Sequence, residues 1–285
     1  MTNLERYLSA SIKSSKSITK EFSTSFSLGI RCLGKEIRDP VYSIYGFVRV
    51  ADEIVDTFFE TNQEALLKDF ESSTFSAIKE KFSTNVILHS FQSTVNKYNI
   101  DSHLIEAFFE SMKSDLNKNK HSQKSLDSYI YGSAEVVGLM CLKIFVNGDQ
   151  KHYDNLIFSS RKLGSAFQKV NFFRDMNEDY NEKGRMYFPG LDFSKKINEE
   201  IKDKIEQEIK SEFDDAKKGI YKLPSSSRFG VLLACRYYEK LFKKLKSTPI
   251  TKLLSRRIRV SNFQKFALIP STFALSFVKN YSKKL

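Results

Sequence analysis

Residues 49–56 (RVADEIVD) place three acidic side chains inside an otherwise apolar stretch, residues 41–59 (VYSIYGFVRVADEIVDTFF). Apolar residues recur there every three or four positions, which predicts an α-helix. With about 100° of rotation per residue, Asp52 and Asp56 lie within about 40° of each other on that helix. Arg49 lies on the same face, three residues before Asp52. Such a face is either a solvated surface with an Arg–Asp pair or a site for Mg²⁺, which prefers hard oxygen ligands.

A second polar stripe lies within residues 153–181, which also have helical spacing. Gln168, Asn171, Asp175 and Asp179 stand at positions i, i+3, i+7 and i+11. Their oxygen-bearing side chains therefore line up along three turns of one predicted helix. The Asp-x-x-x-Asp spacing of the first stretch is repeated here, again with an arginine beside it.

The two stripes together predict a metal-dependent diphosphate site. If the two helices face each other, their carboxylates surround a cavity in which metal ions grip a diphosphate and neutralise it as it leaves. Each motif alone is compatible with a solvated helix face. The pair, followed by the loop at residues 184–189 (GRMYFP), favours the metal site.

Helical spacing extends over most of the chain, whereas the strict alternation of a β-strand is scarce. Prolines fall between the periodic segments or at their starts, and Pro270 would start or kink the last one. These observations predict an all-α fold with one domain, residues 1–285. The predicted helices cover residues 41–59, 63–81, 101–116, 125–146, 153–181, 197–220, 228–246 and 262–280.

Composition narrows the function classes. The chain has 46 Lys and Arg against 34 Asp and Glu, a net charge of +12, which suggests an anionic partner such as nucleic acid, an acidic membrane or a phosphorylated substrate. No nucleic-acid-binding signature supports the first. The three cysteines are widely spaced, and the four histidines have no zinc-ligand spacing. A cytoplasmic protein is expected, because no secretory signal is visible and the apolar stretch 266–278 is interrupted.

The sequence lacks the residues that the two common nucleotide-binding loops require. The segment 29–36 (GIRCLGKE) has the outline of a P-loop, but Glu36 stands where Ser or Thr would hold magnesium. No two glycines are separated by a single residue, so a dinucleotide-binding GxGxxG turn is absent.

These motifs resemble those of the squalene/phytoene synthase family. The resemblance runs from Ser23 to about Lys265, and within the family the pattern is most similar to bacterial phytoene synthases. It implies the isoprenoid synthase fold, an all-α domain with a central active-site cavity. The matching segments are residues 23–26 (STSF), 42–56 (YSIYGFVRVADEIVD), 129–138 (YIYGSAEVVG) and 168–189.

The family chemistry joins two allylic prenyl diphosphates head to head. One substrate ionises, the C2=C3 double bond of the other attacks its carbocation, and the cyclopropylcarbinyl diphosphate that results ionises and rearranges. The resemblance implies a prenyltransferase that converts geranylgeranyl diphosphate to phytoene through prephytoene diphosphate, in carotenoid biosynthesis. The implied cofactor is Mg²⁺, with Mn²⁺ as a substitute, and no NADPH is expected. The alternative is a C30 squalene or dehydrosqualene synthase that uses farnesyl diphosphate.

The resemblance also assigns roles by position. Four aspartates and Tyr129 form the implied catalytic set, with Tyr129 near the carbocation, where its π face favours positive charge. The implied metal ligands are Asp52, Glu53, Asp56, Asn171, Asp175 and Asp179. The implied substrate contacts are Ser23, Ser25, Arg49, Gln168, Asn171, Tyr237, Arg257 and Lys265.

The sequence departs from the family pattern at two positions. Glu53 stands where many relatives have Asp, and it keeps the charge with a longer reach. Glu135 stands where relatives usually have Gly, so either that helix face is open or Glu135 points away to pair with a basic residue. Channel depth would decide substrate length through residues such as Ile30 and Tyr42, and the small Ile30 favours the C20 substrate.

Two other classes of function remain as alternatives. Some family members are non-catalytic assembly factors that have lost the acidic residues, and the retained aspartates argue against this here. A basic helical binder of nucleic acid is the second alternative, although no nucleic-acid partner is expected. Since the product is insoluble in water and the chain is basic, peripheral contact with the inner membrane is expected. The oligomeric state stays open.

Overall fold

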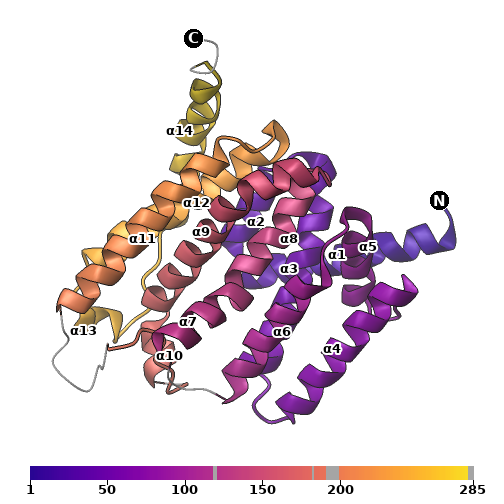
Figure 1. The fold of residues 1–285 in the computed structure, drawn as a ribbon, viewed down its shortest axis with the longest axis horizontal. Helices are drawn as coiled ribbons and strands as arrows, with labels where there is room; N and C mark the ends of the chain where they lie inside the picture. The colour runs from indigo at the N-terminus through magenta and orange to yellow at the C-terminus, as the bar shows by residue number, and fades with distance from the viewer. Residues whose placement is uncertain (118–120, 182, 191–198, 282–285) are drawn as a thin grey trace.

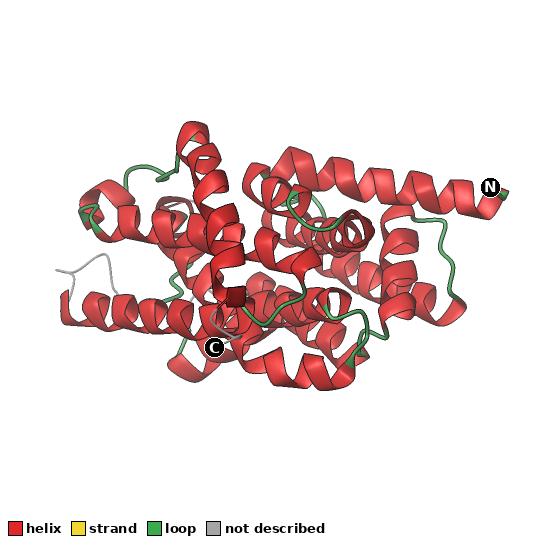
Figure 2. Ribbon diagram, turned by 90° about the horizontal axis from the view of Figure 1, so that it is seen from above, coloured by secondary structure: helices red, strands yellow, loops and turns green. Residues whose placement is uncertain are grey.

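The computed structural model describes residues 1–117, 121–181, 183–190 and 199–281, without the side chains of residues 25, 199, 250, 262 and 278–281. The described residues form helices and no β-strand, which confirms the all-α prediction (Figures 1 and 2). In chain order the elements are α1 Asn3–Phe22, α2 Thr24–Arg31, α3 Lys35–Asp56, α4 Gln63–Glu80, α5 Val86–Tyr98, α6 Ser102–Asn117, α7 Gln123–Ile130, the π-turn η1 Tyr131–Glu135, α8 Val136–Phe145, α9 Gln150–Arg174, α10 Met176–Asn181, α11 Glu199–Ile220, α12 Ser225–Lys246, α13 Ile250–Leu253 and α14 Asn262–Tyr281.

Helix α3, which carries the first acidic motif, begins earlier than its sequence pattern predicts. It starts at Lys35 and contains Pro40, so the predicted start at residue 41 is wrong. A proline lacks the N–H that would bond to the residue four positions before it. Pro40 lies near the start of α3, so it removes only one backbone hydrogen bond of the helix. The apolar residues that follow it pack into the core.

Helix α1 was not predicted, because its buried face is polar. The buried residues of α1 are Ser11, Ser15 and Thr19, which give no apolar periodicity. Ser15 packs on Gly46 of α3, where an added Cβ would lie 2.7 Å from the Ser15 Cβ. The small residues allow the two helices to approach closely, and the Ser15 hydroxyl bonds to that of Ser90 on α5 at 2.7 Å.

The core forms on two sides of a cavity. On one side α3, α5, α6 and α8 pack together, with the rings of Phe47 and Phe91 stacked at a centroid distance of 3.8 Å. On the other side α9, α11 and α12 enclose a second apolar cluster. Figure 1 shows α9, α11 and α12 running alongside one another. The two acidic motifs lie on facing walls between these halves, on α3 and at the end of α9.

The π-turn η1 brings α7 and α8 against α9 and settles the position of Glu135. An added Cβ on Gly164 of α9 would lie 2.8 Å from the Ala134 carbonyl oxygen, so the backbones do touch here. The Glu135 backbone is part of this contact, since the same added Cβ would lie 2.9 Å from its Cα. Glu135 is accommodated because its side chain turns to Arg161 on α9, with 2.5 Å between Oε2 and Nε. Of the two alternatives for Glu135, the structure has the ion pair with a basic residue.

Within the part of the chain that the structure describes, one helical stretch, Gln123–Phe145, is long and apolar enough to cross a membrane by length and composition alone. It comprises α7, η1 and α8, and 56% of its most apolar window is buried inside the structure. Its apolar residues are therefore accounted for by the core.

Candidate active site

The last turns of α3 form one wall of a cavity of about 530 Å³. Asp52 and Asp56 both line this cavity. Glu53 does not, because the next position along a helix points about 100° away. Its buried carboxylate forms an ion pair with Arg49, one turn earlier. Arg49 lines the cavity, and its buried Nε has no hydrogen-bond partner among the described residues. Glu53 was predicted to be a metal ligand, but in the structure its side chain pairs with Arg49 and does not line the cavity.

The second acidic motif spans a helix junction. The continuous helix predicted over residues 153–181 is interrupted at Asp175, which separates α9 from α10 with φ −98° and ψ 8°. The backbone bonds continue across the break, since the Asp175 N–H donates to the Asn171 carbonyl (2.8 Å) and the Asp179 N–H to the Asp175 carbonyl (2.9 Å). The predicted polar stripe therefore survives the break. The cavity is lined by Gln168, Asn171, Asp175 and Asp179.

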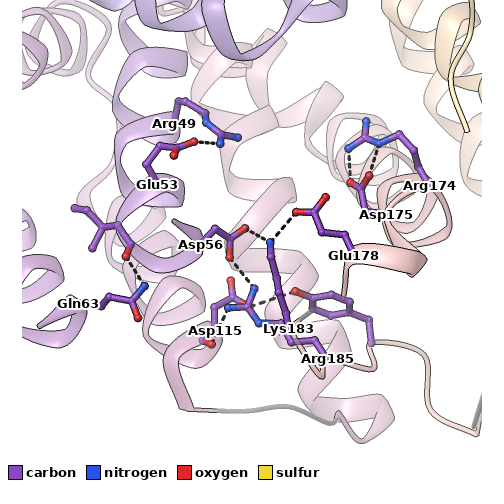
Figure 3. A network of polar contacts seen from close by, with 12 residues as sticks. Arg49, Glu53, Asp56, Gln63, Asp115, Arg174, Asp175, Glu178, Lys183 and Arg185 are labelled. Atoms are coloured by element: carbon purple, nitrogen blue, oxygen red, sulfur yellow. Dashed lines mark hydrogen bonds and ion pairs between the residues drawn. The ribbon is translucent and has the colours of Figure 1, made fainter. Parts of the chain in front are cut away.

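Cationic side chains that were not singled out in the sequence connect the two motifs (Figure 3). Lys183 Nζ lies 3.0 Å from Asp56 Oδ2 and 3.3 Å from Glu178 Oε1. Arg185 Nη1 lies 2.7 Å from Asp56 Oδ1. The segment after α10 thus returns to the α3 wall, and Asp56 is neutralised by two cations that follow the second motif in the sequence.

Asp175 has its own cations. Arg174 Nε donates to Asp175 Oδ1 at 2.9 Å, and Arg257 Nε lies 2.8 Å from the same oxygen. The structure thereby brings the predicted substrate contact Arg257 to the second motif. Asp52 and Asp179, in contrast, form no ion pair with any residue that the structure describes.

The two unpaired aspartates have strongly shifted pKa values. Burial raises the pKa of Asp52 to about 7, and the charge of Asp56 adds to the shift. Burial likewise raises the pKa of Asp179 to about 7, with Asp175 adding to it. Burial also acts on Asp56, but its ion pairs with Lys183 and Arg185 outweigh it and lower the pKa of Asp56. Nearby cations, Arg49 at Asp52 and Lys183 at Asp179, offset part of these increases. Each motif therefore combines one acid in an ion pair with one whose pKa is dominated by burial.

A further buried acid, Asp115 on α6, holds the tyrosines of the site. The Tyr129 hydroxyl donates to Asp115 Oδ2 at 2.8 Å, and the Tyr187 hydroxyl lies 3.5 Å from Oδ1. Arg185 donates to the Asp115 backbone carbonyl at 3.1 Å. Burial raises the pKa of Asp115 to about 7.

Sequence reasoning missed Asp115, although a signal was present. Asp115 continues the helical spacing of Leu104, Phe108 and Met112, which are buried on α6. An acid in line with an apolar stripe is expected to be buried, and buried acids need a hydrogen-bonding partner. The hydrogen-bond partners of Asp115 lie outside α6. The apolar spacing of α6 could therefore predict that Asp115 is buried, but not that it contacts Tyr129 and Tyr187.

The donor set of the two motifs fits Mg²⁺ by its chemistry. No three Asp, Glu, His or Cys side chains among the described residues are grouped closely enough to hold one ion by themselves. Mg²⁺ usually takes one or two carboxylates and fills its other positions with water and substrate phosphate oxygens. Asp52 and Asp179 are half-buried, line the cavity and form no ion pair with a described residue, so a cation in the cavity would neutralise them.

Beyond the charged end, the cavity is apolar. Ile30 lines it, as predicted, whereas Tyr42 does not. Tyr42 is buried, and its hydroxyl has no hydrogen-bond partner among the described residues. The aromatic side chains Tyr129, Phe172 and Tyr187 also line the cavity, with the Phe172 and Tyr187 rings stacked at 4.0 Å. The apolar lining includes Phe26, Leu33, Val137, Cys141, Leu142, Phe145, Leu163, Phe167, Ile220, Leu223 and Val231.

The remaining predicted substrate contacts divide into two groups. Ser23 lines the cavity and caps α2, accepting a hydrogen bond from the Phe26 N–H at 3.3 Å. Tyr237 and Lys265 do not line it; Lys265 Nζ lies 5.5 Å from the Tyr237 ring centroid, in a small surface hollow. The side chain of Ser25, on α2, lies outside the described residues.

Fold and site together describe an all-α protein with a cavity that is charged at one end and apolar at the other. A family model described as squalene/phytoene synthase matches residues 19–264. The chain belongs to this family, whose members are prenyltransferase-type enzymes that act on prenyl diphosphates.

Curated relatives and solved structures are similar over most of the chain. Phytoene synthase 1 of Arabidopsis thaliana is 25% identical, over 94% of this chain and 67% of its own length. Phytoene synthase 2 of Solanum lycopersicum is 26% identical, over 92% and 89%. A dehydrosqualene synthase crystal structure has a TM-score of 0.82 at 20% identity, covering 99% of this chain and 100% of that one. Squalene synthase from Alicyclobacillus acidocaldarius has a TM-score of 0.72 at 19% identity, with 88% and 97% covered. These structures establish the isoprenoid synthase fold.

Proposed function

We propose that this chain joins two molecules of geranylgeranyl diphosphate head to head, forming phytoene through prephytoene diphosphate in carotenoid biosynthesis, with Mg²⁺ as cofactor. One observation carries the proposal: a single cavity has acids and cations at one end and a long apolar lining at the other. A prenyl diphosphate has the same division between its diphosphate and its hydrocarbon chain. The similarity to phytoene synthases supports the C40 product.

The charged end would hold the diphosphate. When bound, Mg²⁺ supplies positive charge between carboxylate and phosphate oxygens and stabilises the leaving diphosphate. The ligands would be Asp52 and Asp56 on one wall and Asn171, Asp175 and Asp179 on the other. Arg49, whose Nε is unpartnered, is positioned to donate to a phosphate oxygen.

Lys183 and Arg257 now pair with the same carboxylates that would hold the metal. A bound diphosphate is an alternative anionic partner for both cations. Their transfer from carboxylate to phosphate would free Asp56 and Asp175 as ligands and stabilise the negative charge that develops on the leaving group.

The aromatic middle of the cavity would protect the carbocation. The rings of Tyr129 and Phe172 would offer negative π density to a cation, and their stacking on Tyr187 would exclude water that would quench it. The hydrogen bond from Tyr129 to Asp115 fixes the orientation of the Tyr129 ring.

The experiment that tests the proposal is incubation of the purified chain with Mg²⁺ and either geranylgeranyl or farnesyl diphosphate, without NADPH. Hydrocarbons are extracted and identified by mass spectrometry. We expect a C40 product from geranylgeranyl diphosphate, with a higher kcat/KM than for farnesyl diphosphate. Ile30→Phe, which fills the apolar part of the cavity, should shift this ratio towards farnesyl diphosphate, whereas the volume-conserving Ile30→Leu should leave it nearly unchanged.

Other outcomes would overturn specific parts of the proposal. A C30 product alone would establish the farnesyl diphosphate alternative. No hydrocarbon from either substrate, with Mg²⁺ or with Mn²⁺, would contradict catalysis and support a non-catalytic family member.

A further inference from the structure

Arg49 has two acidic side chains within reach on its own helix. Asp52 is three positions after it and Glu53 is four positions after it, and both spacings make neighbours on a helix surface. In the structure Arg49 Nη2 donates to Glu53 Oε1 (Figure 3). The structure describes the Asp52 side chain as well and has no ion pair between it and Arg49. The acid that lines the cavity is therefore left unpaired, and the acid that does not line it takes the arginine.

The aromatic ring of Phe22 covers one face of the same guanidinium. Arg49 Cζ lies 4.5 Å from the centroid of the Phe22 ring. This is within the range of about 6 Å over which a ring attracts a cation. A phenylalanine ring has no lone-pair acceptor, so it holds the guanidinium by its face and leaves the N–H groups at the edge unoccupied.

The position of Phe22 depends on the helix contact between α1 and α3. Phe22 is the last residue of α1, and it lines the cavity together with Thr19 of the same helix. Two turns before Phe22, Ser15 packs on Gly46, which is three positions before Arg49 on α3. The buried Thr19 lies between these two points. The end of α1 is thus held beside the last turns of α3 by contacts that do not involve Arg49.

These contacts leave one buried donor of Arg49 for a ligand. Glu53 takes the Nη2 end of the guanidinium, and Phe22 covers a face. The Nε atom is buried and has no hydrogen-bond partner among the described residues. A buried donor without an acceptor costs free energy, which an anion oxygen in the cavity would recover. An arginine that is already immobilised also loses little rotamer freedom when it binds that anion.

We propose that Glu53 and Phe22 are positioning residues for Arg49, which hold its guanidinium away from Asp52 and keep the Nε–H free for a phosphate oxygen. This inference rests on the proposed function, which places a diphosphate at the charged end of the cavity. Glu53 then serves the first acidic motif without binding metal. By taking Arg49 it keeps the Asp52 carboxylate free for a cation and the arginine free for the anion.

A simple charge effect at Glu53 predicts the opposite result. If Glu53 acted only through its negative charge, its removal would make the site more positive and strengthen the binding of an anion. If Glu53 positions Arg49, its removal allows Arg49 to pair with Asp52, three positions away. That pair would occupy both the guanidinium and the carboxylate, so anion binding would weaken.

Isothermal titration of the full chain with inorganic pyrophosphate and Mg²⁺ tests the inference without a prenyl chain or turnover. We expect Glu53→Gln and Phe22→Leu each to raise the Kd for pyrophosphate at least about threefold. Glu53→Asp keeps a carboxylate and Phe22→Tyr keeps a ring, so both should bind more tightly than Glu53→Gln and Phe22→Leu. In an Arg49→Met background neither Glu53→Gln nor Phe22→Leu should weaken binding further, because both act through Arg49.

The matched controls are an ion pair and a cation–ring contact outside the cavity. Glu206 is buried and pairs with Lys202, four positions earlier on α11, at 3.1 Å. Phe158 on α9 is 60% exposed, compared with 50% for Phe22, and Lys162 Nζ lies 5.9 Å from its ring centroid. Glu206→Gln and Phe158→Leu should bind pyrophosphate as the unmodified chain does. Circular dichroism should show the same helix content in all variants.

The outcomes separate this inference from the proposed function. Unchanged or tighter pyrophosphate binding by Glu53→Gln would overturn the role of Glu53, and unchanged binding by Phe22→Leu would overturn that of Phe22. Equal weakening with and without Arg49 would overturn both roles, because the two residues would then act independently of Arg49. In all three cases the proposed function stands. An unmodified chain that binds no pyrophosphate with Mg²⁺ would contradict the proposed diphosphate site itself, and this inference with it.

Discussion

The two Asp-x-x-x-Asp motifs have the same spacing but opposite patterns of pairing. On α3 the second acid, Asp56, is paired with cations, and the first, Asp52, is not. At the α9–α10 junction the first acid, Asp175, is paired, and Asp179 is not. Acids with identical spacing in the two motifs are therefore of two kinds, which differ in ion pairing. One kind is paired with cations of the protein, and the other lines the cavity half-buried without an ion pair among the described residues. We expect this second kind to be the acids that a metal ion neutralises.

The difference has a structural origin. Asp56 is at the end of α3, where it meets the segment containing Lys183 and Arg185. Asp175 is at the break between α9 and α10, where Arg257 reaches it. The unpaired acids Asp52 and Asp179 are each one turn away from these contacts. Pairing thus depends on which turn of each helix meets a neighbouring segment.

The largest effect is expected from removing an unpaired acid. Asp52→Asn and Asp179→Asn should each lower kcat by at least about 100-fold, because each removes a carboxylate ligand of the Mg²⁺ that would stabilise the leaving diphosphate. Above pH 7 the metal-free variants should be as stable as the unmodified chain or more stable, since a buried, uncompensated charge is lost. Steady-state kinetics and thermal melts measure both.

The matched control for this pair is Asp69→Asn, an exposed acid on α4. It should change neither kcat nor Tm measurably. Normal turnover in Asp52→Asn or in Asp179→Asn would contradict the assignment of that residue to the metal site.

Removing the paired acid of α3 should affect stability as well as activity. Asp56→Asn leaves Lys183 and Arg185 without their carboxylate. We expect the free energy of unfolding to fall by on the order of 1–3 kcal/mol. Denaturant melts of Asp56→Asn and Asp52→Asn, measured without metal, compare the two kinds of acid directly. Equal stabilities for the two variants would mean that the pairing has no energetic consequence.

The effect of Mg²⁺ on stability should depend on pH. Asp52, Asp115 and Asp179 have a pKa of about 7 in the folded chain, above the value of about 4 expected when unfolded. The folded state therefore binds more protons between these values, and these groups make the metal-free protein less stable as the pH rises from about 4 to about 7. Asp56, with a lowered pKa, acts in the opposite direction at lower pH.

Mg²⁺ competes with those protons, so its stabilising shift of Tm should be larger at about pH 8 than at about pH 6. Thermal melts with and without Mg²⁺ at the two pH values measure this, and NaCl at the same ionic strength is a control for general screening. A shift that is the same at both pH values would argue against metal binding by the unpaired acids.

The smallest effect is expected from an ion pair outside the site. Glu135→Gln weakens the contact with Arg161, which is 47% exposed, and exposed pairs contribute about 0–1 kcal/mol. We expect a Tm within a few degrees of the unmodified chain and unchanged kcat. A large loss of activity would show that the π-turn, and not only the acids, is sensitive to charge.

Sequence patterns predicted which residues line the site better than they predicted the contacts that those residues make. The spacing at Asp52, Asp56, Asp175 and Asp179 was enough to predict two facing acidic walls, and the structure lines one cavity with all four. It could not show that Glu53 turns to Arg49 or that the helix breaks at Asp175. Both depend on local packing that a periodic pattern does not specify.

Helix α1, which was not predicted, and helix α14, which was, both bury a face other than the one that apolar periodicity suggests. Helix α1 buries serine and threonine against Gly46, so the contact that holds it in place is made by small polar residues. Helix α14 shows the reverse, because its apolar face was visible in the sequence but points outward in the structure. Apolar periodicity predicts that a helix forms, whereas the fold decides which side of it is covered.

The sequence by itself determined the all-α class, the family and the two acidic stripes, because each depends on residues three or four positions apart on one helix. The tertiary structure decided which acids are neutralised, since Lys183 meets Asp56 across 127 positions of chain. It also joined Tyr129 and Tyr187 to Asp115 and left the phenylalanine face of α14 uncovered. Such contacts depend on how distant segments pack, and local spacing holds no information about that packing.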